Sequence, residues 1–124
     1  MGKNQIMSRF LNRNLEHPKV QNKHKNFLIR SLGRCIGNVV MHKLLLEYTN
    51  KPESKGFIKN EIKEYSSDAF EKAQEFNWNV EDKEEIKELA IERVKNLSEG
   101  YKDVVYTDEK MEKFIDETIE EMML

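Results

Sequence analysis

Residues 26–49 carry the pattern that most restricts how this chain folds. Apolar side chains recur there at every fourth position, at Leu28, Leu32, Ile36, Val40 and Leu44. This spacing brings them to one side of an α-helix, and further apolar neighbours widen that side. The pattern therefore predicts a long, largely buried central helix over about 26–49, around which the rest of the chain packs.

Helical spacing also recurs, in shorter stretches, along most of the remaining sequence. It predicts helices in four more segments: 3–16, 54–76, 79–97 and 107–122. Residues 17–25 are mostly basic and polar, and Pro18 disfavours helical geometry at His17, so this segment is expected to be a basic connector. The predicted fold class is all-α, a compact bundle of four to five helices.

Length and composition fit one soluble domain spanning 1–124. The chain has 124 residues, of which 38% are hydrophobic and 35% charged, with a mean hydropathy of -0.79. No run reaches the roughly eighteen apolar residues of a membrane span, and the first residues lack the apolar core of a secretion signal. The single cysteine, Cys35, forms no internal disulfide and is expected to be buried. We therefore expect a cytoplasmic protein with no membrane partner.

The small net charge of -2 conceals an uneven distribution along the chain. Residues 1–46 contain nine Lys or Arg and one acidic residue, whereas residues 47–124 contain twelve basic and twenty-two acidic residues. One interpretation is that the two halves attract each other within the fold. The other is that the basic half faces a polyanion or an acidic protein.

A polar seam interrupts the apolar central helix. Arg30, Arg34, Asn38 and His42 recur at every fourth position and so stack along one edge. Guanidinium, amide and imidazole groups suit the binding of phosphate or carboxylate, although such a seam is also what the solvent edge of an amphipathic helix looks like. With other basic residues, the predicted nucleic-acid-binding set is Arg9, Arg13, Lys19, Lys23, Lys25, Arg30, Arg34, Asn38 and His42.

Phe10 and Phe27, the aromatic residues of this basic part, are assigned to the core, so contacts to a phosphate backbone are favoured over base-specific ones. The predicted function is a small non-enzymatic binding protein whose basic half contacts a nucleic-acid backbone or an acidic partner, for example as an accessory subunit of a nucleoprotein complex. The alternative is a protein-protein adaptor or inhibitor that uses the acidic last helix, with Glu117, Glu120 and Glu121.

A second alternative comes from the pair Arg34 and His42. An arginine followed by a histidine on one helix of a bundle resembles the motif of the HEPN ribonuclease superfamily, in which four to six residues separate the two. Here seven residues separate them, which departs from that pattern. The resemblance implies a small metal-independent ribonuclease, with His42 as general acid or base and Arg34 stabilising phosphate charge.

The remaining cysteine, histidine, glycine and tryptophan residues indicate structural roles and not a metal or cofactor site. Cysteine and histidine residues lack the spacing of a zinc site, and no phosphate-binding glycine loop is present, so no metal or cofactor is expected. Gly33 and Gly37 share one face of the central helix, which predicts a close approach of another helix, with a hinge as the alternative. Trp78 is expected to fold onto the bundle, with a binding anchor as the alternative.

Overall fold

The computed structural model describes residues 18–123, and the side chains of residues 23–122. Four α-helices account for most of this part: α1 (Pro18–Tyr48), α2 (Lys55–Ala73), α3 (Val80–Ser98) and α4 (Asp108–Met123), with a short 3-10 helix at Pro52–Ser54. No strand occurs between residues 18 and 123, so the all-α helical bundle is confirmed. The predicted helix at 3–16, with Arg9 and Arg13, lies outside the described residues.

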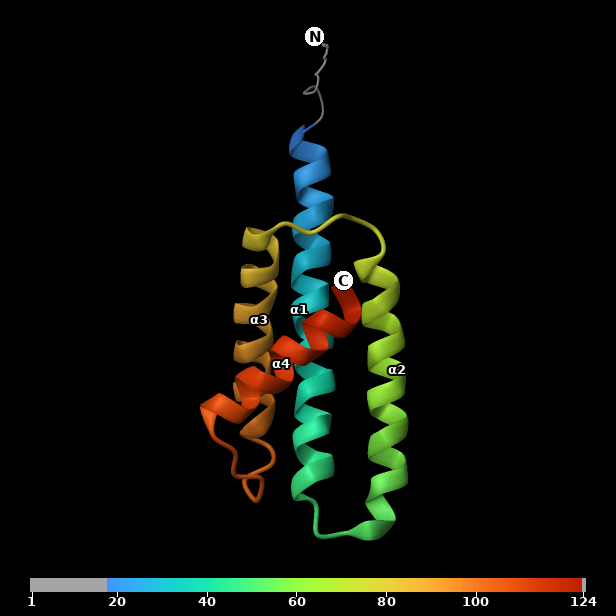
Figure 1. The fold of residues 1–124 in the computed structure, drawn as a ribbon, viewed down its shortest axis with the longest axis vertical. Helices are drawn as coiled ribbons and strands as arrows, with labels where there is room; N and C mark the ends of the chain where they lie inside the picture. The colour runs from blue at the N-terminus through green and yellow to red at the C-terminus, as the bar shows by residue number, and fades with distance from the viewer. Residues whose placement is uncertain (1–17, 124) are drawn as a thin grey trace.

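Helix α1 lies between α2 and α3, and α4 crosses in front of α1 at an angle (Figure 1). Helices α1 and α3 run in the same direction because residues 74–79 carry the chain over the top of the bundle between α2 and α3. Helix α4 contacts α1, α2 and α3, whereas α2 and α3 do not contact each other. Helix α1 is therefore the element against which each of the other three helices packs.

The start of α1 corrects the prediction of a connector at 17–25. Residues from Pro18 onward are helical, so the helix predicted at about 26–49 is part of a longer one whose first turns are polar. Pro18 occupies the first helical position, where its missing N–H and fixed φ are compatible with a helix. Contacts with other elements also support these turns: Lys25 Nζ lies 2.8 Å from Asp82 Oδ2, and His24 Nε2 lies 3.8 Å from Glu75 Oε1.

The core forms where the inward face of α1 meets the other helices. Leu32, Ile36, Val40 and Leu44 are completely buried, as the spacing in the sequence predicts. Each of the other helices contributes fewer groups: Ala69 and Ala73 from α2, Ile86, Ala90 and Val94 from α3, and Met111, Ile115 and Met122 from α4. Burial of these side chains is the main stabilising term in a helical bundle of this size.

The two glycines of α1 lie at the contact with α3, which confirms the predicted close approach. A Cβ atom added at Gly33 would lie 2.5 Å from Leu89 Cβ, and one added at Gly37 would lie 2.5 Å from Arg93 Cβ. Real Cβ atoms essentially never approach so closely. The absence of side chains at these two positions therefore sets the distance between the two helices.

Local contacts fix the connection between α2 and α3. Asn79 caps α3 through a capping box: its Oδ1 accepts from the Asp82 backbone N–H at 2.8 Å, and Asp82 Oδ2 accepts from the Asn79 N–H at 3.2 Å. Trp78 Nε1 donates to the Ala73 carbonyl at 2.8 Å, and its ring packs partly buried against the core, as predicted. Asp82 therefore both caps α3 and binds Lys25 of α1.

None of the described helices combines the length and the apolar character that a membrane span requires.

Candidate functional site

One side of α1 presents basic side chains together with an aromatic ring. Lys23, Phe27, Arg30 and Arg34 are all exposed, and their spacing places them on one side of the helix. We call these four residues the basic face of α1. Phe27 is 58% exposed, so its assignment to the core is wrong. It precedes the inward-facing Leu28 by one position, which turns it toward solvent.

The basic face lies on the side of α1 that is turned away from α4. Lys43 marks the α4 side, because its Nζ donates to Thr118 Oγ1 of α4 at 2.9 Å. Arg34 precedes Lys43 by nine residues, or about two and a half turns, and therefore projects from the opposite side of the helix. Helix α4 thus leaves the basic face uncovered.

Arg93 of α3 extends this face, and its position depends on Asn38. Arg93 Nε donates to Asn38 Oδ1 at 3.0 Å, and Asn38 is only 9% exposed. Gly37 provides the space for the Arg93 stem, since a Cβ there would lie 2.6 Å from Arg93 Cγ. With Nε engaged, the two terminal nitrogens of the guanidinium are the donors left for an anion. Asn38 is therefore a positioning residue for Arg93.

Three arginines meet at this place. Arg30, Arg34 and Arg93 line a shallow pocket of about 180 Å³, and the other lining residues are Leu89, Glu92 and Asn96. Three guanidinium groups against one carboxylate leave the lining net positive. No carboxylate forms an ion pair with Arg30 or Arg34 among the side chains that the structure describes. We refer to this place as the arginine pocket.

The remaining residues of the predicted binding set have different surroundings. Lys25 is paired with Asp82, and its Nζ lies about 6 Å from the centres of the Phe76 and Trp78 rings, which gives it a structural role. Lys19 lies in the first turn of α1, where no side chain is described. The structure therefore brings together only part of the predicted set, namely Lys23, Arg30 and Arg34, with Asn38 behind them.

His42 lies apart from this group. Its Nδ1 is 2.7 Å from the carbonyl oxygen of Asn38 in the preceding turn, and its ring is tilted against Tyr65 of α2 with the ring centres 5.3 Å apart. It lines a different pocket from the one that contains Arg34. The pairing that the ribonuclease resemblance implies is thus not supported by a shared pocket.

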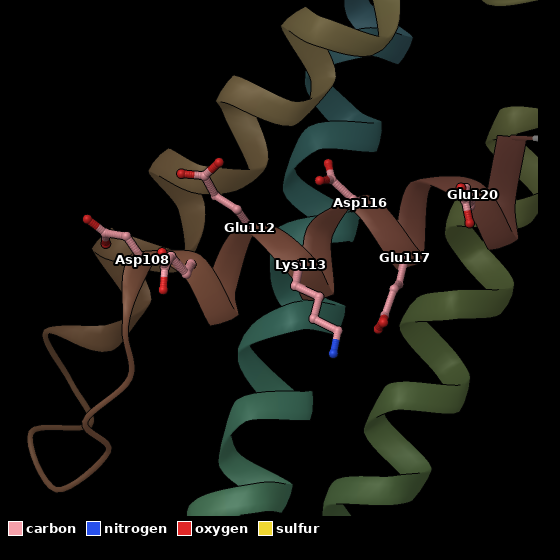
Figure 2. A pocket seen from close by; sticks show the side chains of 7 residues that line it. Asp108, Glu112, Lys113, Asp116, Glu117 and Glu120 are labelled. Atoms are coloured by element: carbon pink, nitrogen blue, oxygen red, sulfur yellow. The ribbon is translucent and has the colours of Figure 1, made fainter.

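Acidic side chains cover the outer side of α4 (Figure 2). The hollow that these side chains line has a volume of about 460 Å³. All of its lining residues come from this one helix, so it is an open face and not an enclosed pocket. Glu112 and Asp116 lie 3.8 and 3.0 Å from Lys87 Nζ, whereas Glu117 and Glu120 are exposed. Hydrogen bonding to Asp116 raises the pKa of Lys87 above its ordinary value. The outer face of α4 is therefore predominantly acidic.

Cys35 is buried between α1 and α2, as predicted, but it is also hydrogen-bonded. Its Sγ donates to Asp68 Oδ2 at 3.2 Å, and Asp68 Oδ1 accepts from Lys72 Nζ at 2.8 Å. Burial, together with the Asp68 carboxylate, raises the pKa of the Cys35 thiol to about 11. The Lys72 ammonium and the thiol hold the pKa of Asp68 below its ordinary value.

We expect the Cys35 thiol to react slowly with iodoacetamide in the folded protein. At pH 8 a thiol with a pKa of about 11 is ionised about a hundredfold less than one with a pKa of 9.0, and only the thiolate reacts. The rate, measured by mass spectrometry, should rise by about that factor or more when the chain is unfolded in urea. Equal rates in the folded and unfolded protein would contradict this assignment.

No group of three or more His, Cys, Asp or Glu side chains suited to a metal ion occurs in the described part of the chain. Comparisons with models of protein families, with curated proteins and with solved structures found no match for this sequence. The geometry of the residues themselves is thus the basis for assigning a function.

Proposed function

We propose that this protein binds the phosphate backbone of a nucleic acid through the basic face of α1 and Arg93, as a binding protein rather than an enzyme. The observation that carries the proposal is the arginine pocket, where Arg30, Arg34 and Arg93 lie together. Neither of the two arginines on α1 forms an ion pair with a described carboxylate. A guanidinium offers two parallel donors to the oxygens of a phosphate, which makes it well suited to this ligand.

The surroundings of the pocket favour an extended ligand over a single small anion. Lys23 and Phe27 continue the same side of α1 beyond Arg30, so the positive surface is longer than the pocket. Phe27 offers one exposed ring on which a base can stack, while the charges contact the backbone. Glu92 in the pocket reduces the local charge and limits the affinity for any one phosphate.

Reversing two charges of the pocket tests this function. In the variant Arg30→Glu with Arg34→Glu, we expect binding of a twelve-nucleotide single-stranded RNA or DNA to weaken at least about tenfold. Two lost phosphate contacts should also make the plot of log Kobs against log salt shallower by about 1.4, because each contact on a single strand contributes about 0.7. Fluorescence anisotropy at several salt concentrations measures both quantities.

The matched control is Lys59→Glu with Lys63→Glu. These exposed lysines are also four residues apart on a helix, α2, and the change in net charge is the same. Binding and its salt dependence should change little in this variant. Equal losses in both variants, or no binding by the unaltered protein, would contradict the proposal.

The acidic face of α4 supports a second candidate, an adaptor or inhibitor that docks on a basic partner. Glu117 and Glu120 are exposed on this face, whereas Glu121 lies 3.5 Å from Lys43 Nζ. Two results would support this candidate: the protein does not bind nucleic acid, and a basic protein recovered with it by affinity capture is no longer recovered when Glu117, Glu120 and Glu121 are changed to Lys.

A further inference from the structure

A second cavity lies at the end of the bundle opposite residues 74–79. It is bounded by the connection between α1 and α2 and by residues 100–104 of the connection between α3 and α4, both of which lie at the bottom of Figure 1. Its volume is about 440 Å³, which falls in the range of roughly 300–1,000 Å³ that is usual for small-ligand sites. The cavity shares no lining residue with the arginine pocket.

Three aromatic side chains line this cavity and are only partly covered by the protein. Tyr48 of α1, Phe57 of α2 and Tyr101 of the connection between α3 and α4 are 36%, 67% and 42% exposed. The other exposed large apolar side chains, Phe27, Phe70, Val80 and Val105, do not line it. Exposed apolar groups that gather at one place indicate a binding surface, and aromatic rings favour a flat partner that stacks on them.

Polar groups of the same cavity suit the edge of a heterocyclic base. The carbonyl of Asn38 can only accept, so His42 Nδ1 carries the proton in the 2.7 Å hydrogen bond between them. In the tautomer that carries its proton on Nδ1, Nε2 is an acceptor, and His42 lines the cavity. Asn50, also in the lining, offers both a donor and an acceptor.

Charged groups of the lining add a preference for a negative group on the ligand. Lys51 and Lys102 are exposed and line the cavity from the two connections, and Asp103 is the acidic residue beside them. Two ammonium groups against one carboxylate leave the rim net positive. A phosphate attached to the stacked ring would lie within the field of both lysines.

From these contacts we infer that the cavity binds a nucleotide, with the base against Tyr48, Phe57 and Tyr101 and the phosphate near Lys51 and Lys102. The ligand is either a free mononucleotide or one nucleotide of a strand, because both present the same base and phosphate. The inference is independent of the arginine pocket, and with a strand it would add a second contact to the proposed function.

Titration with the four ribonucleoside monophosphates, followed by the histidine signals in the NMR spectrum, tests the inference. At least one of them should bind and shift the His42 ring signals. In the variant Phe57→Ala with Tyr101→Ala, its dissociation constant should rise at least about tenfold, because two stacking surfaces are removed. Both side chains are exposed, so the variant should retain the cooperative unfolding of the parent protein.

Two further variants separate this site from other effects. Phe70→Ala removes a 50% exposed ring of α2 that does not line the cavity, and nucleotide binding should be unchanged. Lys59→Glu with Lys63→Glu, which reverses two charges at residues that line neither pocket, should also leave mononucleotide binding unchanged. Loss of mononucleotide binding in either of these variants would contradict the location of the site.

A twelve-nucleotide single strand identifies the source of the nucleotide. If the Phe57→Ala, Tyr101→Ala variant binds the strand at least about tenfold more weakly, the cavity takes a nucleotide of the strand. If only mononucleotide binding is weakened, the cavity takes a free nucleotide. If neither ligand depends on Phe57 and Tyr101, the inference is wrong.

Discussion

Replacing Leu32 with alanine should lower the free energy of unfolding by about 2–5 kcal/mol, the usual cost of removing a buried leucine side chain. Leu32 has no exposed surface and lies in the part of α1 that faces the core. The rigid neighbouring helices cannot fully close the space that the shorter side chain leaves. Urea unfolding followed by circular dichroism at 222 nm measures the change.

Phe27 is the matched control on the same helix. It is larger than Leu32 but 58% exposed, so Phe27→Ala should change stability by less than about 0.5 kcal/mol. The same variant should weaken binding of a single strand, because the stacking surface on the basic face is lost. A loss of stability as large as that of Leu32→Ala would mean that Phe27 is part of the core after all.

Substitution of either glycine of α1 should also be strongly destabilising. Gly33→Ala and Gly37→Ala remove helix-disfavouring glycines, which by itself would stabilise α1 by up to about 1 kcal/mol. The new Cβ, however, would lie 2.5 Å from Leu89 Cβ or Arg93 Cβ, so α1 and α3 must move apart. Overpacking of this kind costs about 1–3 kcal/mol, and we expect a net loss of about 1–2 kcal/mol for each variant.

Gly56 in the first turn of α2 gives the opposite expectation. Nothing lies within 4 Å of a Cβ added there, so Gly56→Ala should raise the free energy of unfolding by about 0.4–1 kcal/mol. All three variants are compared by urea unfolding under the same conditions. If Gly33→Ala and Gly37→Ala were as stable as Gly56→Ala, the close contact between α1 and α3 would be absent.

The features that the sequence predicted correctly are those that depend on neighbours along the chain. The apolar residues at every fourth position from Leu28 to Leu44 indicate the buried side of α1, because an α-helix completes one turn every 3.6 residues. The helix predicted over 79–97 corresponds to α3, whose first turn is fixed by local contacts of Asn79 with Asp82. The two glycines indicated a neighbouring helix, although the spacing of residues did not identify α3 as that helix.

The features that it missed depend on contacts between distant segments. Pro18 begins α1 in a polar stretch, and later side chains of that stretch contact Asp82 of α3 and Glu75 in the connection after α2. These partners are distant in the sequence, so a local pattern cannot reveal them. Arg93 completes the arginine pocket through Asn38, which is fifty-five residues away in the sequence. A buried amide beside a glycine signals a polar partner, but only the fold identifies it.

The separation of basic and acidic surfaces has a consequence for how the molecule approaches a ligand. Arg30 and Arg34 project from the side of α1 that faces away from α4, and Glu117 and Glu120 lie on α4 itself. These two groups of opposite charge therefore contribute an electric dipole across the described helices, although the net charge of the chain is only -2. The field of a polyanion exerts a torque on this dipole and turns the arginines toward the polyanion, so correctly oriented encounters become more frequent at low ionic strength.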